Sequence, residues 1–147
     1  MNDIPEYPEM LYPETPLNLP DSKQAPEYGS DIIADVLSSL GFEHVFIVPG
    51  SSFRGLQDSL VNYTRNKKPE IILCTTETIA VAMAHGYAKS TGKPALCIIH
   101  DLVGLMLGSM AVYNAYCDRS PVMILGGSGP LDPAQRRYID WVHSANT

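Results

Sequence analysis

The fold is decided by the stretch Ile71-Ile-Leu-Cys-Thr-Thr-Glu77-Thr-Ile-Ala-Val-Ala-Met-Ala-His-Gly86-Tyr-Ala-Lys-Ser-Thr-Gly92-Lys-Pro94. Its first four residues form an apolar run typical of a buried strand, and the alanine-rich segment that follows is typical of a helix. The hydroxyl of Thr75 or Thr76 can cap this helix, and Gly92 ends it. A single carboxylate, Glu77, therefore lies in the first helical turn directly after a strand, a placement that points it into a cleft.

Strands and helices alternate on both sides of this stretch. Short apolar runs that end in turn residues predict buried strands at 45–48, 71–74, 95–99 and 122–125. Helices are expected at about 53–63, from 77 to the turn at Gly92, and at about 103–116. Before the first strand, Ser30 is expected to cap a helix that Gly41 ends, with an apolar face made of Ile32, Ile33, Val36, Leu37 and Leu40. Four rounds of strand and helix predict an α/β fold: a doubly wound, mainly parallel sheet flanked by helices.

The first 28 residues differ from the rest of the chain. They hold six of the twelve prolines and none of the eleven glycines, and their six acids and one lysine account for −5 of the net charge of −6. This composition predicts a stiff, extended, acidic arm at 1–28, followed by one folded domain at 29–147.

Charge and hydropathy exclude several classes of function. An acidic chain without a basic stripe is not expected to bind nucleic acid. The longest weakly polar stretch, 102–117, is shorter than the roughly 20 residues that a membrane span needs. The three cysteines, Cys74, Cys97 and Cys117, have no metal-ligand spacing and are expected to be small buried hydrophobes in a reducing compartment. Without a secretory signal pattern, the expected location is the cytoplasm, and no metal site built by the protein is predicted.

Ligands of open parallel sheets bind beyond the carboxyl ends of the strands. Four loops are expected at that edge, at 49–53, 75–77, 100–104 and 126–129, and the polar and glycine residues of the chain gather in them. From these residues alone, Glu77 could equally be an acid that stabilises the positive end of a helix. The lone His100 at a strand end could equally be a hydrogen-bonded structural residue.

The string of Glu77, Gly86-Tyr-Ala and Thr91-Gly-Lys-Pro94 resembles the N-terminal pyrimidine-binding domain of thiamine-diphosphate-dependent enzymes, in the acetolactate synthase and benzoylformate decarboxylase group. The resemblance extends from about Tyr28 to the end of the chain. It implies that Glu77 is catalytic and binds the cofactor: its carboxyl hydrogen-bonds N1′ of the aminopyrimidine, which lets the cofactor's own 4′-nitrogen remove the C2 proton.

The same resemblance assigns roles to two further loops. In the loop after the first strand, Pro49 and Gly50 are expected to contact the cofactor, and Ser51 and Ser52 the substrate. His100 is expected to be a catalytic and substrate-binding residue, because decarboxylating members carry a histidine in this loop. Acetolactate synthases tend to carry Gly-Pro-Gly there, which departs from the His-Asp-Leu-Val-Gly sequence of this chain.

The resemblance also implies partners that the sequence does not contain. The family's diphosphate-binding domain holds Mg²⁺ with a Gly-Asp-Gly to Asn motif, and that motif does not occur among these 147 residues. We therefore expect a 2-oxo acid substrate, thiamine diphosphate as cofactor, Mg²⁺ only through that other domain in the same or another chain, and a homo-oligomer. The isolated chain is expected to be inactive, and the large aromatic Trp141 near its end suggests that the polypeptide continues or that a partner covers it. The alternative is a flavodoxin-like, non-catalytic binding or regulatory domain.

Overall fold

A computed structural model describes residues 25–127. The predicted arm up to residue 24, the end of the fourth loop and Trp141 lie outside the described residues. The first half of the described chain contains α1 (Gly29–Ser39), β1 (His44–Ile47), the short 3-10 turn η1 (Ser51–Phe53), α2 (Arg54–Asp58) and η2 (Ser59–Tyr63). The second half contains β2 (Glu70–Leu73), α3 (Glu77–Thr91), β3 (Ala95–Ile99), α4 (Asp101–Cys117) and β4 (Val122–Gly126).

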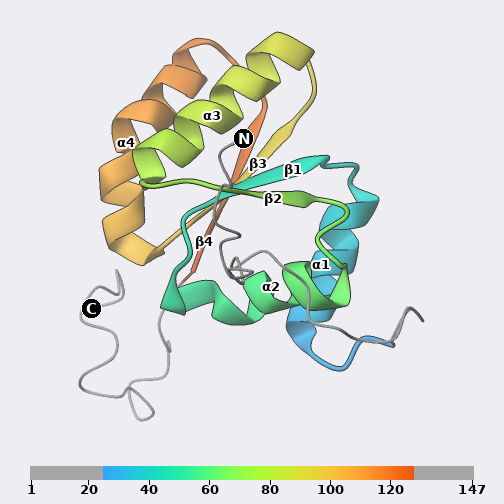
Figure 1. Ribbon diagram of the computed structural model, residues 1–147. Coiled ribbons are helices and arrows are strands. Elements are labelled where there is room, and N and C mark those ends of the chain that lie inside the picture. Colours follow the sequence, from blue (N-terminus) through green and yellow to red (C-terminus); the bar gives the residue numbers. More distant parts are fainter. Residues whose placement is uncertain (1–24, 128–147) are drawn as a thin grey trace, which may run out of the picture.

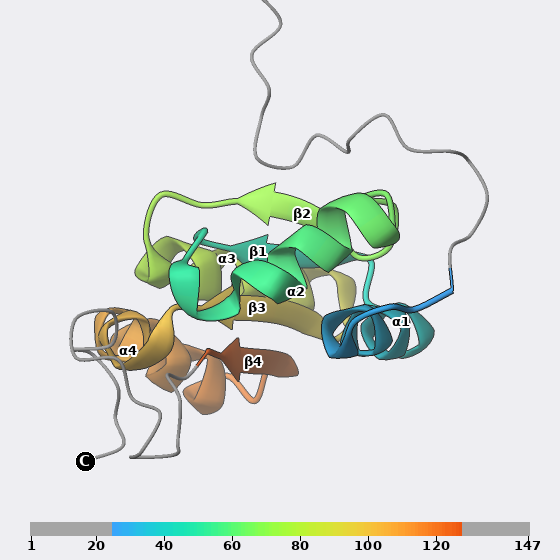
Figure 2. The same cartoon turned by 90° about the horizontal axis from the view of Figure 1, so that it is seen from below.

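The described strands form one parallel sheet in the order β2-β1-β3-β4. Figure 2 shows their four arrowheads pointing the same way. Helices cover both faces, with α3 and α4 side by side on one and α1 and α2 on the other (Figure 1). The predicted α/β fold with a doubly wound parallel sheet is therefore confirmed.

Element boundaries differ from the expected ones by one or two residues. The first two strands begin and end one residue earlier than predicted, at His44–Ile47 and Glu70–Leu73, and α4 begins at Asp101 rather than 103. The helix expected at 53–63 changes type along its length: it starts as η1, continues as α2 and widens into a π-helix over Ser59–Tyr63. A local apolar pattern reports a helical period but not which carbonyl each N–H selects, so this change could not be predicted.

The start of α1 differs from the expected serine cap. Ser30 lies inside the first turn, and the carboxylate of Asp31 instead accepts hydrogen bonds at 3.0 Å from the backbone N–H groups of Glu27 and Tyr28. Burial of this carboxyl favours the neutral acid, but the bond from Tyr28, with those from Ser59 and Glu27, outweighs it and lowers the pKa of Asp31. Gly41, at φ +85°, ends the helix region as predicted.

The apolar face predicted for α1 is only partly buried. Ala34 and Leu37 pack into the core. Four of the five residues predicted for that face are instead about half exposed: Ile32, Ile33, Val36 and Leu40. The helix is apolar on more sides than the sheet covers, so the sequence periodicity did not identify the buried stripe.

The sheet separates two hydrophobic cores of different composition. The core under α1 and α2 is built from large side chains, among them Leu37, Phe53, Leu60 and Ile98. The core under α3 and α4 is built mainly from small ones, including Ala80, Ala84, Ala88, Ala95 and Ala111 with Cys74 and Cys97. Small side chains allow helices to approach a sheet and each other closely, because less volume separates their backbones.

Two of the three cysteines are buried as predicted, but Cys117 is exposed at the end of α4. It follows Tyr116 on the outer side of that helix, where a partly apolar sequence does not imply burial. Within residues 25–127, no helix is long and apolar enough to cross a membrane.

Candidate functional site

The carboxyl ends of the four strands meet at one edge of the sheet because all four are parallel. Along this edge lie the turn before α3, the loop after β1, His100 after β3 and the glycines at the end of β4. In a sheet of order 2-1-3-4 the connections diverge between β1 and β3, which is where ligands of such folds bind. The fold thus places the loop of Pro49 to Ser52 beside His100 at this point.

Glu77 is the first residue of α3, and the helix is capped by the residue before it. Thr76 Oγ1 accepts a hydrogen bond of 3.3 Å from the backbone N–H of Ile79. This confirms the threonine cap and fixes the direction in which the Glu77 side chain leaves the helix. The cap thus ties the position of the carboxyl to that of the strand end before it.

The Glu77 side chain is enclosed by α4. The residue is only 8% exposed, and in the described part of the chain its carboxyl has no hydrogen-bond or ion-pair partner. A methyl group at Gly104 would lie 3.1 Å from both Cγ and Oε1 of Glu77, a tight contact, so the glycine lets α4 approach the carboxyl this closely without a shift of either. The fully buried side-chain polar atoms without a partner in residues 25–127 do not include the Glu77 oxygens, so the carboxyl still reaches solvent and is open to a ligand.

The Glu77 carboxyl also acts on the buried thiol of β3. Burial, with smaller contributions from Cys74 and Glu77, raises the pKa of Cys97 to about 12. Cys97 is fully buried, so it stays a neutral thiol and contributes an apolar wall beside the acid.

His100 lies between β3 and α4 and contacts the loop after β1. Its Nδ1 is 2.7 Å from Oγ of Ser52, and Gly50 packs against its ring, since a methyl group there would lie 3.1 Å from Nδ1. On the other side of the pair, a methyl group at Gly127 would lie 2.3 Å from Ser52 Oγ. Three loops that are distant in sequence therefore meet around one histidine.

Two of the six predicted site residues stay at the surface. Pro49 and Ser51 are exposed. Glu77 and His100 are linked through the first turn of α4: the Gly104 N–H donates to the His100 carbonyl over 2.7 Å, and the same residue packs against the Glu77 carboxyl. Sequence reasoning missed Gly104 and Gly127 as site residues. The only available signal was a glycine within a helix and another after a strand, because a glycine in such a place suggests that another part of the chain packs closely against its backbone.

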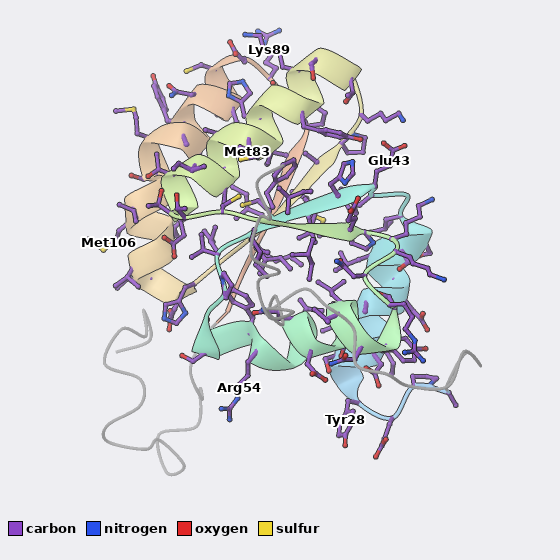
Figure 3. The ribbon with its side chains drawn as sticks, viewed as in Figure 1. Tyr28, Glu43, Arg54, Met83, Lys89 and Met106 are labelled. Carbon is purple, nitrogen blue, oxygen red and sulfur yellow. The ribbon has the colours of Figure 1, made fainter. Side chains whose placement is uncertain are left out.

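A surface pocket of about 430 Å³ lies elsewhere, between the start of α1 and α2. It is lined by Tyr28, Ser30, Arg54, Gly55, Asp58 and Ser59, and so by neither Glu77 nor His100. The labelled Arg54 points out from α2, away from the body of the protein (Figure 3). This pocket therefore does not contain the candidate chemistry. Among the described residues, no three His, Cys, Asp or Glu side chains gather so that they could hold a metal ion.

Residues 28–146 match the family of the thiamine pyrophosphate enzyme, N-terminal TPP binding domain. The chain belongs to this family. The acetolactate synthase large subunit of Lactococcus lactis is 31% identical over 109 residues, which are 74% of this chain and 18% of that protein. The chloroplastic acetolactate synthase of Arabidopsis thaliana is 32% identical over 105 residues, 71% of this chain and 15% of that protein.

Solved structures agree with this family. The benzoylformate decarboxylase from Polynucleobacter necessarius superposes with a TM-score of 0.60 at 26% identity, over 68% of this chain and 18% of that one. The chain thus spans less than a fifth of the length of the relatives it matches. Family membership favours a thiamine-diphosphate enzyme domain over the flavodoxin-like alternative, although flavodoxin-like folds share the strand order 2-1-3-4.

Proposed function

We propose that this chain is the pyrimidine-binding half of an acetolactate synthase-like enzyme that uses thiamine diphosphate to decarboxylate a 2-oxo acid, to transfer the resulting acyl group, or both. The observation that carries the proposal is the carboxyl of Glu77, which belongs to a buried residue, has no partner among residues 25–127, and lies at the ligand-binding edge of the sheet. The names of the relatives, acetolactate synthase and benzoylformate decarboxylase, support this chemistry.

The residues present fit the aminopyrimidine ring of the cofactor. A pyrimidine nitrogen offers the hydrogen-bond partner that the Glu77 carboxyl lacks within the described part of the chain, and the neutral Cys97 thiol beside that carboxyl suits an apolar ring. Gly50 in the loop after β1, with Pro49 next to it, brings backbone rather than side chains to the same edge. When bound, thiamine diphosphate supplies the acidic C2–H of its thiazolium ring as the source of a carbon nucleophile.

The role of Glu77 is to hold and exchange the proton at N1′ of the pyrimidine. The Glu77 side chain lies against the first turns of α4, so its carboxyl is oriented toward one small region of the sheet edge. Gly104 leaves room for the carboxyl at this position, since a methyl group there would lie 3.1 Å from Oε1 and would require a small shift of the side chain. His100 is the group for proton transfer on the substrate side, and the exposed hydroxyl of Ser51 is available to a substrate carboxylate.

The outer face of α4 is proposed to bind the diphosphate-binding domain, contributed by the same or a second chain of a homo-oligomer. This helix is apolar on all sides, and its exposed residues include Met106, Met110, Tyr113 and Tyr116 at 60–77% exposure. Figure 3 shows Met106 pointing away from the protein. The face is continuous with the site because α4 begins next to His100, and relatives are more than five times longer than their match to this chain. Mg²⁺ would enter with that domain.

The decisive experiment compares Glu77→Gln with the wild type in the complete enzyme. Glutamine keeps the shape but cannot exchange a proton, so hydrogen–deuterium exchange at C2 of the bound cofactor should slow by a factor of about 10² or more. NMR after acid quench measures it. The matched control is Glu70→Gln, the same change at an exposed acid at the start of β2. Exchange as fast in Glu77→Gln as in wild type would return Glu77 to the role of a helix-start acid.

A second test concerns the chain by itself. It supplies the pyrimidine half of the site without the Mg²⁺-diphosphate anchor, so calorimetry with Mg²⁺ should detect weak binding of thiamine diphosphate or none. Micromolar or tighter binding by the chain alone would contradict a divided site.

A further inference from the structure

One hydrogen bond joins the loop after β1 to the histidine after β3. Oγ of Ser52 lies 2.7 Å from Nδ1 of His100, although the two residues are 48 positions apart in the sequence. We propose that Ser52 is a positioning residue: it donates its hydroxyl proton to Nδ1 and so holds His100 in the tautomer that carries its proton on Nε2. The inference rests on the proposed function, in which His100 transfers a proton on the substrate side.

The backbone of two glycines encloses this pair. A methyl group at Gly127 would lie 2.3 Å from Oγ and 2.7 Å from Cβ of Ser52, and one at Gly50 would lie 3.1–3.2 Å from the ring and Cβ of His100. Distances below 3.0 Å are not tolerated by real side chains, so Gly127 must be a glycine while Ser52 keeps this conformation. The hydroxyl and the ring are therefore held by backbone on both sides, and the contact is not a loose surface pairing.

Donor and acceptor roles follow from the available partners. If Nδ1–H donated to the serine, the hydroxyl proton would need a second acceptor, and in the described residues Ser52 Oγ has no hydrogen-bond partner besides Nδ1. If the hydroxyl donates to Nδ1, the same bond satisfies both groups. The second arrangement leaves the proton of the neutral imidazole on Nε2.

The tautomer matters because the two ring nitrogens have different roles. The bond made by one nitrogen of a histidine fixes whether the other is a donor or an acceptor. With Nδ1 occupied by Ser52, the free Nε2–H is the group that can donate a hydrogen bond or a proton to a substrate. The two neighbouring serines thus have different roles: Ser52 orients His100, and the exposed Ser51 is available to bind the substrate.

Nitrogen NMR of the full chain without cofactor tests the tautomer directly. In a long-range ¹H–¹⁵N correlation spectrum, wild-type His100 should show a pyridine-type Nδ1 and a pyrrole-type Nε2, with the signals assigned by their loss in His100→Ala. Ser52→Ala should shift both nitrogens toward the averaged values of two exchanging tautomers. The matched control is Ser51→Ala, the same change one residue away, which should leave the His100 signals unchanged.

A second variant tests the same contact without removing the hydroxyl. Gly127→Ala should displace Ser52 and change the His100 tautomer as Ser52→Ala does, while amide spectra verify that each variant is folded. A pyrrole-type Nδ1 in the wild type, or unchanged nitrogen signals in folded Ser52→Ala, would overturn the proposal. Because these spectra involve no cofactor, their outcome is independent of the Glu77→Gln exchange experiment, which tests the proposed function.

Discussion

The two faces of the sheet are packed with side chains of different size. Under α1 and α2, large leucine, isoleucine, phenylalanine and valine side chains form the core. Under α3 and α4, alanines dominate, and Gly104 and Gly108 bring α4 against Glu77 and Val81. The first face buries more apolar area per residue and so gives more stability, whereas the second allows helices to lie close together around a carboxyl. On the second face, large residues such as Met110 are left on the outside, where a partner can cover them.

The largest effect on stability should come from the face of the sheet under α1 and α2, whose core is built from large side chains and is called the large-residue face below. Leu60 is fully buried there, and Leu60→Ala should lower the free energy of unfolding by about 2–5 kcal/mol, because a cavity remains where the side chain was. Urea denaturation of the chain measures the loss. Met110→Ala, at 66% exposure on α4, should change the stability of the chain by less than about 0.5 kcal/mol. Equal losses in both variants would contradict the burial of Leu60 and the exposure of Met110.

A larger side chain should destabilise the small-residue face, which is the alanine-rich core under α3 and α4. Ala84 lies on the fully buried side of α3, and Ala84→Leu should cost about 1–3 kcal/mol, since the helix must move outward to admit the extra atoms. Ala82→Leu, on the exposed side of the same helix, is the control and should be near neutral. In the complete enzyme, the displaced α3 should also weaken cofactor binding in Ala84→Leu. Full stability in that variant would mean that this core is loosely packed.

Alkaline pH should destabilise the small-residue face through Cys97. Burial raises the pKa of this thiol from 9.0 to about 12, so between these values the unfolded chain loses a proton that the folded chain keeps. Stability should therefore fall as pH rises above 9, by about 1 kcal/mol between pH 9 and 10 and by roughly 1.4 kcal/mol over the next unit. Cys97→Ala should reduce the fall of stability with pH.

Thiol modification is a separate test of the same burial. In the folded chain a thiol reagent should modify the exposed Cys117 rapidly, and rapid modification of Cys97 would contradict its burial.

The helix caps on the two faces should have similar effects on stability and different effects on the site. Asp31→Ala at α1 and Thr76→Ala at α3 should each cost about 1 kcal/mol, because each removes a side-chain acceptor from a helix start. Thr76→Ala should also disturb the position of Glu77 and lower C2 exchange in the complete enzyme, whereas Asp31→Ala should leave exchange unchanged. Exchange that falls equally in both variants would show that the α1 face also positions the site.

Removal of residues 1–24 should affect neither face. The segment is rich in proline, lacks glycine and has no periodic apolar face, so the thermal midpoint of a truncated chain should stay within a few degrees of the full chain. The truncation must end before Glu27, because the Glu27 and Tyr28 amides bond the Asp31 carboxyl. A larger drop would mean that the segment packs against the domain.

The sequence by itself determined the order of strands and helices, because alternating apolar runs, a threonine cap and glycine ends are local signals. Ala95–Ile99 was predicted to the residue, and residue types alone narrowed the start of α3 to a cap at Thr75 or Thr76 and identified its end at Gly92. It also located Glu77 and His100 as candidates, since both follow strands that a parallel sheet aligns at one edge.

The tertiary structure alone decided which neighbours those residues have. The Ser52–His100 bond spans 48 residues, and the contact of Gly104 with Glu77 joins two different helices. No local sequence pattern predicts either contact, because each depends on a residue that is distant in the sequence and lies opposite only in the folded chain. The same reason explains the errors at α1 and at Cys117: a periodic or apolar sequence shows that a side chain can be buried, whereas burial itself depends on how far the neighbouring elements extend over it.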